Sequence, residues 1–144
     1  MAEFNRDYFN VESGAQDRSR KGRFFHLDEV TGFEAAAGLV LKPIWGENLM
    51  LSFVYMEPHS VAPEHSHPEE QMGLVIDGEY EFDINGEKRL CRRGDVYWIP
   101  PNVPHSARTY EKGCFALDVF NPPRQAFKAL QEAAEKRRRE GGGA

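Results

Sequence analysis

The chain has 144 residues, 40% of them hydrophobic, and a formal net charge of −5. This length predicts one domain that folds without disulfide bonds, and the hydrophobic content excludes wholesale disorder. We expect neither nucleic acid nor a membrane as a partner, because phosphate binding needs a basic face and no run approaches the roughly 18 apolar residues that span a bilayer.

The first 22 residues are polar and charged, which predicts a flexible arm. Its first residues, Met1 to Asp7, contain no apolar segment typical of a secretory signal peptide. The two cysteines, Cys91 and Cys114, form no CxxC pair, and we expect both to be reduced thiols. Together these features predict a cytoplasmic protein.

Short β segments separated by turn residues follow the arm. Leu49 to Met56 is apolar and predicts a buried strand, as does Gly73 to Ile76. From Tyr80 to Asn85, large apolar residues alternate with polar ones, which is the period of a half-buried strand. Asn85-Gly86 predicts a type I′ hairpin, because both central residues of that turn need a positive φ, and Asp77-Gly78 predicts another tight turn.

The last part of the chain changes from strands to a helix. Val96 to Ile99 predicts a strand that the following prolines break, and Pro122-Pro123 ends the β region. Gln125 to Arg139 predicts the one helix, with a narrow apolar stripe expected to pack on the β domain as a lid. The stripe consists of Phe127, Leu130 and Ala134.

Many short strands without interleaved helices indicate an all-β sandwich or barrel. We therefore assign residues 1–22 to the arm, residues 23–122 to the β-barrel, and residues 123–144 to the helix and tail.

Histidines at strand spacing suggest a metal site. His65 and His67 are two residues apart in a β context, so both imidazoles can face one cavity. Gln71 follows four residues later and His105 much later. Imidazole nitrogens suit transition metals such as Zn, Ni, Fe or Mn, and an amide oxygen adds one neutral ligand. By itself, the His65–His67 pair is equally compatible with a chance surface pair.

Two longer segments carry a family resemblance. The segment from Pro63 to Gly78 has the pattern His-x-His, then an amide, then glycine after six intervening residues, and resembles the first cupin motif. The segment from Gly94 to His105, GDVYWIPPNVPH, resembles the second. The resemblance covers Leu49 to Arg124 and implies a cupin (jelly-roll) barrel with one divalent transition metal. The implied ligands are His65, His67, Gln71 and His105.

The third ligand departs from the usual cupin pattern. Cupins usually have glutamate there, and this chain has Gln71. Glu70 is the alternative ligand, but it would point to the opposite face of the strand, and Gln71 has the spacing to Gly78 that the motif prescribes. Glu64 and Glu69 flank the site, and we expect both to be solvated charges at its rim.

The strand before the helix carries candidate catalytic residues. Asp118 and Phe120 share one face of this strand. If that face is inward, the apolar surroundings would raise the pKa of Asp118 and suit it to proton transfer. Arg124 follows the strand and could bind a substrate carboxylate through paired hydrogen bonds. The alternative is that Asp118 faces solvent and Arg124 merely begins the helix.

The combination of HSHPxEQ, GDxxxIPPNxPH and DVFxPPR resembles the small single-domain cupins of pectin and alginate breakdown, the KdgF type. That resemblance implies a lyase or isomerase that opens 4,5-unsaturated monouronates to a linear 4-deoxy keto-uronate. Asp118 and Arg124 would then handle the proton and the carboxylate of a small anionic substrate, and Phe120 would shape the pocket.

Two other functions stay open. A cupin dioxygenase would cleave a carbon–carbon bond of an enolic substrate, although a neutral Gln71 in place of glutamate disfavours it. A non-enzymatic cupin would bind a small acid or sugar and would need no positioned acid at Asp118.

We also expect a homodimer, because edge strands of an open barrel invite pairing and the aromatic residues of the arm have no place in a single barrel. These residues are Phe4, Tyr8, Phe9, Phe24 and Phe25. His26 and His59 lie outside both motifs, and we expect them to be ordinary surface or packed histidines.

Overall fold

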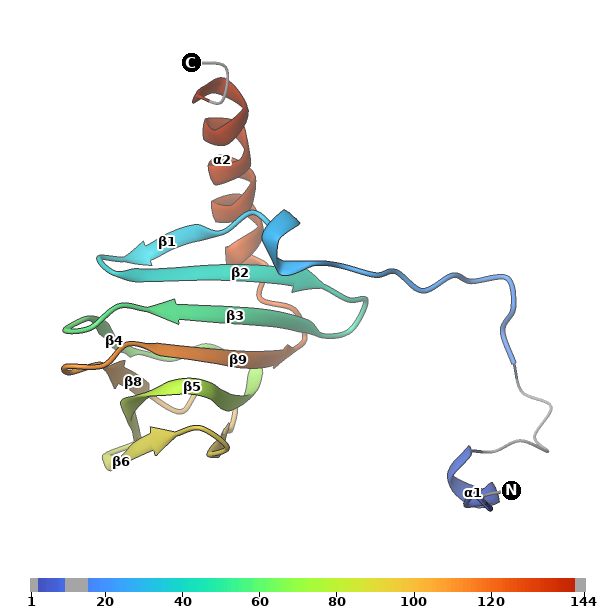
Figure 1. Cartoon of the computed structure of the whole chain (residues 1–144), viewed down its shortest axis with the longest axis horizontal. Coiled ribbons are helices and arrows are strands. Elements are labelled where there is room, and N and C mark those ends of the chain that lie inside the picture. The colour runs from blue at the N-terminus through green and yellow to red at the C-terminus, as the bar shows by residue number, and fades with distance from the viewer. Residues whose placement is uncertain (1–2, 10–15, 142–144) are drawn as a thin grey trace.

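The computed structural model describes residues 3–9 and 16–141. Within these ranges nine strands form a nearly closed antiparallel barrel, and a helix extends from one end of it (Figure 1). The strands are β1 (Phe33–Ala36), β2 (Leu39–Trp45), β3 (Met50–Met56), β4 (Val61–His65), β5 (Glu70–Ile84), β6 (Glu87–Arg92), β7 (Val96–Ile99), β8 (His105–Arg108) and β9 (Cys114–Asn121). The all-β barrel with a C-terminal helix is confirmed.

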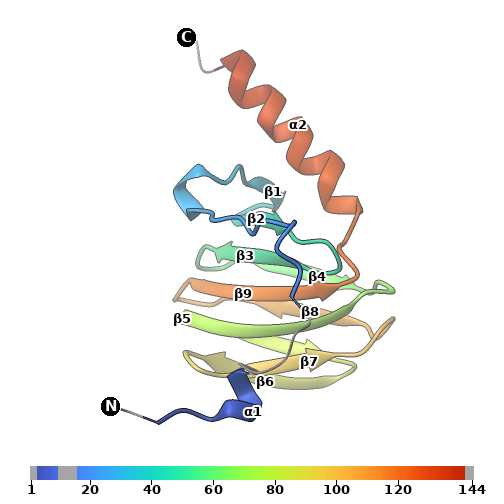
Figure 2. The same ribbon diagram turned by 90° about the vertical axis from the view of Figure 1, so that its right-hand side faces the viewer.

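The strands form two layers that share the long strand β5 (Figure 2). The first half of β5 pairs with β9 and β7, and β9 continues through β3 and β2 to β1. The second half of β5 pairs with β6 and β8, and β8 pairs with β4. Because β5 crosses from one layer to the other, it connects the two walls of the barrel.

The crossing point lies at Asp77-Gly78, where the prediction of a tight turn was wrong. β5 runs unbroken through it, with a register shift against β9 between Val75 and Asp77. Gly78 has a φ of 74°, and a Cβ atom on it would lie 2.0 Å from the carbonyl oxygen of Gly113. A bulge within a strand and a tight turn can both require glycine with positive φ, so the residue pattern alone did not distinguish them.

Burial alternates along the strands, as the two-residue period requires. In β9, Asp118 and Phe120 are buried and face inward, whereas Leu117 and Val119 face outward and are partly buried. Most inward side chains form a hydrophobic core between the layers. A second cluster closes the barrel end beside the helix and consists of Phe33, Met50, Phe120 and Phe127.

The helical segments are α1 (Arg6–Phe9), a 3₁₀ turn (Leu27–Glu29) and α2 (Ala126–Gly141). In α2, Phe127 is buried, and Gln131 donates hydrogen bonds to the carbonyl oxygens of Thr31 and Pro43. Of the predicted stripe, Phe127 and Ala134 pack in the second cluster and Leu130 is 48% exposed, and the C-terminal part of α2 projects away from the barrel (Figures 1 and 2). The stripe therefore packs on the barrel in part, and α2 does not cover the barrel along its whole length.

Across the described ranges, no helix combines the length and the apolar character that a bilayer crossing needs.

Candidate metal centre

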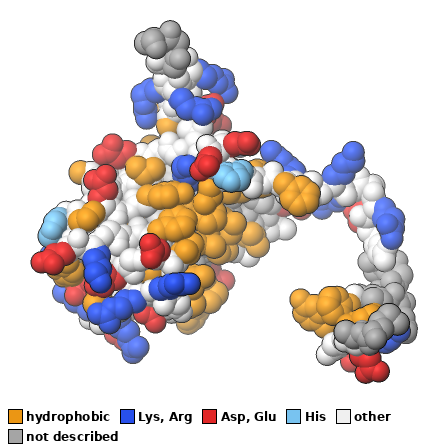
Figure 3. Space-filling model, viewed as in Figure 1, with side chains coloured by type: hydrophobic (Ala, Val, Ile, Leu, Met, Phe, Trp, Pro, Cys, Tyr) orange, Lys and Arg blue, Asp and Glu red, His pale blue; other side chains and the backbone are white. Residues whose placement is uncertain are grey.

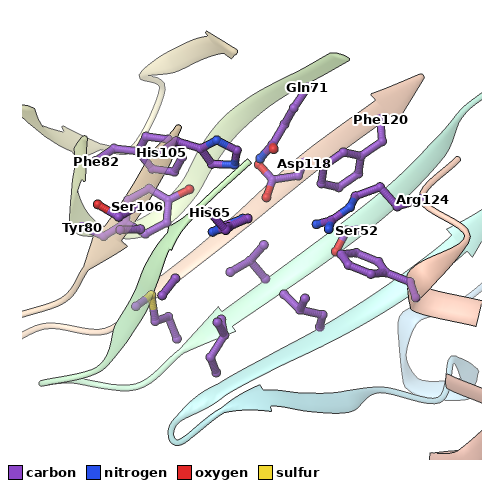
Figure 4. Close-up of a pocket in the computed structure, with 17 residues that line it drawn as sticks. Ser52, His65, Gln71, Tyr80, Phe82, His105, Ser106, Asp118, Phe120 and Arg124 are labelled. Atoms are coloured by element: carbon purple, nitrogen blue, oxygen red, sulfur yellow. The ribbon is translucent and has the colours of Figure 1, made fainter. Parts of the chain in front are cut away.

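Three histidines meet on one wall of the barrel interior. His65 ends β4, His105 begins β8 directly opposite it, and His67 lies in the loop before β5. One ring nitrogen of each lies within 4.8 Å of those of the other two. His67 and His105 are buried and His65 is exposed, so the cluster can be reached from solvent on one side. Figure 4 shows His65 and His105 pointing into the cavity.

A backbone carbonyl lies within hydrogen-bond distance of the Nδ1 atom of each imidazole. The Nδ1 atoms lie 2.7 Å (His65 to Pro63), 3.0 Å (His67 to Glu69) and 2.9 Å (His105 to Val103) from carbonyl oxygens. A carbonyl oxygen can only accept a hydrogen bond, so each Nδ1 carries the proton and each Nε2 keeps its lone pair. Metal-binding histidines are typically oriented by such an outer hydrogen bond.

Gln71 lies beside the cluster. Its side chain is 4% exposed, and its Oε1 lies 3.0 Å from His67 Nε2. A lone pair of the amide oxygen therefore faces the lone pair of the imidazole nitrogen. The amide also hydrogen-bonds Asp118, whose carboxylate can only accept, which fixes the amide orientation. His105 Nε2 is buried and has no hydrogen-bond partner within the described chain. Lone pairs without donors are what a cation would satisfy, so the four side chains fit a divalent transition metal.

Glu70, the alternative ligand, points away from the cavity. Its side chain is exposed and accepts a hydrogen bond of 2.8 Å from Trp98 Nε1 on the outer face of the sheet. The alternation of β5 thus turns Gln71 inward and Glu70 outward.

The buried histidines are uncharged at neutral pH. Burial lowers the pKa of His67, and the positive charge of Arg124 lowers it further. Burial likewise lowers the pKa of His105 to about 4. Neutral imidazole is the metal-binding form, so these two rings need lose no proton to become ligands at neutral pH.

Asp118 faces the same cavity from β9 and is 8% exposed. Tyr97 donates a hydrogen bond of 2.5 Å to its Oδ1, and the Tyr97 hydroxyl also bonds that of Tyr80. Burial raises the pKa of Asp118 to about 6, against the hydrogen bonds from Tyr97 and Gln71 and the charge of Arg124, which lower it. A carboxyl group with this pKa can take up and release a proton near neutral pH.

Arg124 reaches back into the cavity from the segment after β9. Its guanidinium carbon lies 4.7 Å from the centre of the Phe127 ring, and its Nε lies 3.4 Å from Glu69 Oε1. The Glu69 side chain is 16% exposed, and Oε1 also lies 3.7 Å from His67 Nδ1. The prediction of Glu69 as a solvated rim charge was therefore wrong, because this carboxylate holds Arg124 in place beside the histidines.

His65, His105, Gln71, Asp118 and Arg124 line one cavity, which is partly open to solvent (Figure 4). Phe120 forms part of its wall, with its ring centre 5.4 Å from that of His67. His26 instead accepts a hydrogen bond from the Asp28 amide at the start of the 3₁₀ turn, and neither His26 nor His59 lines the cavity.

Comparison with known proteins defines the class. Residues 52–120 match the family model of the cupin domain. The pectin degradation protein KdgF of Dickeya dadantii is 33% identical over 107 residues, which are 73% of this chain and 97% of that protein. The chain belongs to the cupin superfamily.

Within that superfamily the chain is similar to KdgF over almost the whole of KdgF. The structure of KdgF from Halomonas sp. is 28% identical, has a TM-score of 0.69, and matches 74% of this chain and 99% of its own. A second relative, H2HPP isomerase of Bacillus subtilis, is 34% identical over 67 residues, which are 45% of this chain and 28% of that protein.

Sequence reasoning missed two further residues of the cavity region. Ser52 lines the cavity within the apolar run of β3, and Tyr97 bonds Asp118 from the apolar run of β7. A polar atom at an inward position of a buried strand was the signal that could have found both, since such atoms need a partner.

Proposed function

We propose that this chain is a metal-dependent cupin enzyme that opens 4,5-unsaturated monouronates to linear 4-deoxy keto-uronates. The observation that carries the proposal is a cavity lined by two histidines of the three-histidine cluster, His65 and His105, together with the buried Asp118 and the cationic Arg124. The similarity to KdgF over 97% of that protein supports the substrate class.

His65, His67, His105 and Gln71 would hold one divalent ion, which we propose to be Zn, Ni, Fe or Mn. When bound, such an ion supplies a Lewis acid that polarises the oxygen atoms of a sugar acid. All four ligands are neutral, so the ion would keep its full positive charge. Arg124, held by Glu69 and stacked on Phe127, would bind the substrate carboxylate.

Asp118 would move the proton. Opening the ring requires loss of the proton from the C1 hydroxyl as the bond between C1 and the ring oxygen breaks. The enolate left at C5 then takes a proton at C4, which gives the ketone. Asp118 can accept the first proton and deliver the second, because burial holds its pKa near neutrality. Phe120 would form the apolar wall against which the ring lies.

The partial match to H2HPP isomerase favours one second candidate, an isomerase that shifts a proton within a small keto acid without opening a ring. This reaction would use Asp118 in the same way. We also propose a cytoplasmic location, because Cys91 and Cys114 are buried and unpaired, which is typical of a reducing compartment.

The test is whether the metal-reconstituted protein turns over unsaturated monouronates that are prepared from pectin and from alginate. Loss of the ultraviolet absorbance of the conjugated double bond reports the reaction, with and without oxygen. We expect consumption that is independent of oxygen, and a raised KM with little change in kcat for Arg124→Ala, since that change removes binding present in ground and transition states alike. No consumption with any of the four metals, or a strict need for oxygen, would exclude the proposed reaction.

A further inference from the structure

Ser52 is a buried polar residue in an otherwise apolar row. It lies on the inward face of β3 between Met50 and Val54, and it is 1% exposed. Its Oγ has no hydrogen-bond partner within the described residues. A buried hydroxyl left without a partner destabilises a fold, and native proteins rarely keep one without a reason.

The Ser52 side chain faces the reactive part of the cavity. It lines the cavity and pairs directly with Asp118 across the ladder between β3 and β9. Arg124 lines the same cavity, and its backbone amide lies 3.1 Å from the sulfur of Met50, two residues before Ser52 on the same face. Figure 4 shows Ser52, Asp118 and Arg124 lining the cavity.

We infer that Ser52 is a substrate-binding residue whose hydroxyl donates a hydrogen bond to the carboxylate that Arg124 attracts. The hydroxyl supplies one donor without an acceptor, and the guanidinium supplies a cation with several N–H groups. A carboxylate offers two oxygen atoms and about four lone pairs, so it can satisfy both residues at once. The inference rests on the proposed function for the anionic character of the substrate.

The experiment compares Ser52→Ala with Ser60→Ala in the metal-reconstituted protein. Ser60 is a matched control, because it is 6% exposed, lies outside the cavity lining, and donates a hydrogen bond of 3.4 Å from Oγ to the Pro58 carbonyl. Melting temperatures are measured alone, with D-galacturonate and with D-galactose, and calorimetry gives the dissociation constants. The saturated sugars separate binding from turnover, so failure of the proposed reaction on unsaturated uronates leaves this test intact.

Ser52→Ala should melt at the same temperature as the wild type or higher, because it removes an unpaired buried hydroxyl. It should bind galacturonate about tenfold or more weakly, since a hydrogen bond to a charged group is lost. Ser60→Ala should show the opposite pattern, with a lower melting temperature and unchanged binding. The inference is overturned if Ser52→Ala is destabilised or fails to fold, if it binds galacturonate as the wild type does, or if galacturonate stabilises the wild type no more than galactose does.

Discussion

Asp118 is the residue at which opposing electrostatic effects meet. Burial disfavours its charge, whereas Tyr97, Gln71 and Arg124 favour it, and the balance leaves a pKa of about 6. A carboxyl group deep in an apolar barrel would titrate higher without these partners. The residues around Asp118 thus suit it to exchange protons at neutral pH.

Replacing Asp118 by asparagine should remove the proton transfer and keep the shape of the cavity. The amide oxygen of the new side chain could still accept the hydrogen bond from Tyr97, so the fold and the histidine cluster should persist. We expect kcat to fall by roughly 10²–10⁴ with unchanged metal content, because this is the usual loss for a positioned acid or base. Steady-state kinetics on unsaturated uronates measures it, and activity within about threefold of wild type would contradict the role.

The same substitution should change how stability depends on pH in the metal-free protein. The pKa of Asp118 is raised from 3.8 to about 6, so between these values the folded chain binds more protons than the unfolded chain. The stability that Asp118 contributes therefore falls as pH rises through this window. Asp118→Asn does not undergo this loss. Its unfolding free energy relative to that of the wild type should therefore rise by up to about 3 kcal/mol from about pH 4 to about pH 7.

Denaturant unfolding of both proteins at the two pH values measures this gain. The titrations of His67 and His105 are common to both proteins and cancel in the difference. A difference in unfolding free energy that stays constant with pH would contradict the buried, ionisable Asp118.

The residues of the site differed in how far the sequence could predict them. His65, His67 and Gln71 stand at motif spacing. Strand alternation placed Asp118 and Phe120 on one face but left open whether that face is inward, as the structure shows it to be. Glu69 stands in the loop before β5, where no period fixes direction, so its contact with Arg124 was not predictable. Which inward polar atoms meet depends on the pairing of distant strands, which the sequence does not display.

Strands β7, β5 and β9 support Asp118 through a close contact. Gly73 of β5 pairs with Tyr97 on one side and with Asp118 on the other. A Cβ atom at Gly73 would lie 2.2 Å from Cζ of the Tyr97 ring. The missing side chain therefore provides the space in which the Tyr97 hydroxyl reaches the carboxylate.

Gly73→Ala should displace the Tyr97 ring. We expect a loss of about 1–3 kcal/mol of unfolding free energy, as for other overpacked cores, and a fall in kcat with unchanged metal content. Gly22→Ala is the control, because a Cβ there meets no atom within 4 Å. Thermal unfolding and kinetics of both variants check the prediction, which fails if Gly73→Ala behaves as Gly22→Ala does.

Local patterns predicted short-range features better than features that depend on distant segments. Asn85 and Gly86 both have positive φ, 50° and 92°, as the predicted hairpin turn requires. The bend of β5 at Gly78 and the projection of α2 were not predicted, because each depends on a contact with a segment distant in sequence. The Gly113 carbonyl meets Gly78, and Thr31 and Pro43 hold Gln131.

The barrel exposes an apolar outer face on β3, β9, β5 and β7. Two rows of paired residues cross these strands in register, and all eight are apolar. The rows are Leu51, Val119, Met72, Trp98 and Phe53, Leu117, Leu74, Val96. Figure 3 shows hydrophobic side chains gathered on this side of the barrel. An antiparallel sheet usually has one polar face, so an apolar outer face points to a covering partner.

We propose that a second copy of the chain covers this face in a homodimer. Sedimentation velocity should give twice the chain mass of 16.4 kDa, and Leu74→Lys should shift the protein to monomers by placing a charge in the middle of the face. Val61→Lys is the control, because Val61 is 42% exposed but lies on β4 in the other layer. A monomeric wild type, or a dimer unaffected by Leu74→Lys, would contradict the proposal.

Metal content tests the proposed centre most directly. Metal-free protein is incubated in turn with Zn, Ni, Mn and, without oxygen, ferrous iron, then dialysed and analysed by mass spectrometry of the metals. We expect one bound ion per chain in the wild type and in His26→Ala/His59→Ala, which removes two histidines outside the cavity. We expect no bound ion in His65→Ala/His105→Ala, because it removes two of the three clustered imidazoles. A wild type that retains none of the four metals, or a His65→Ala/His105→Ala variant that retains its ion, would contradict the metal centre.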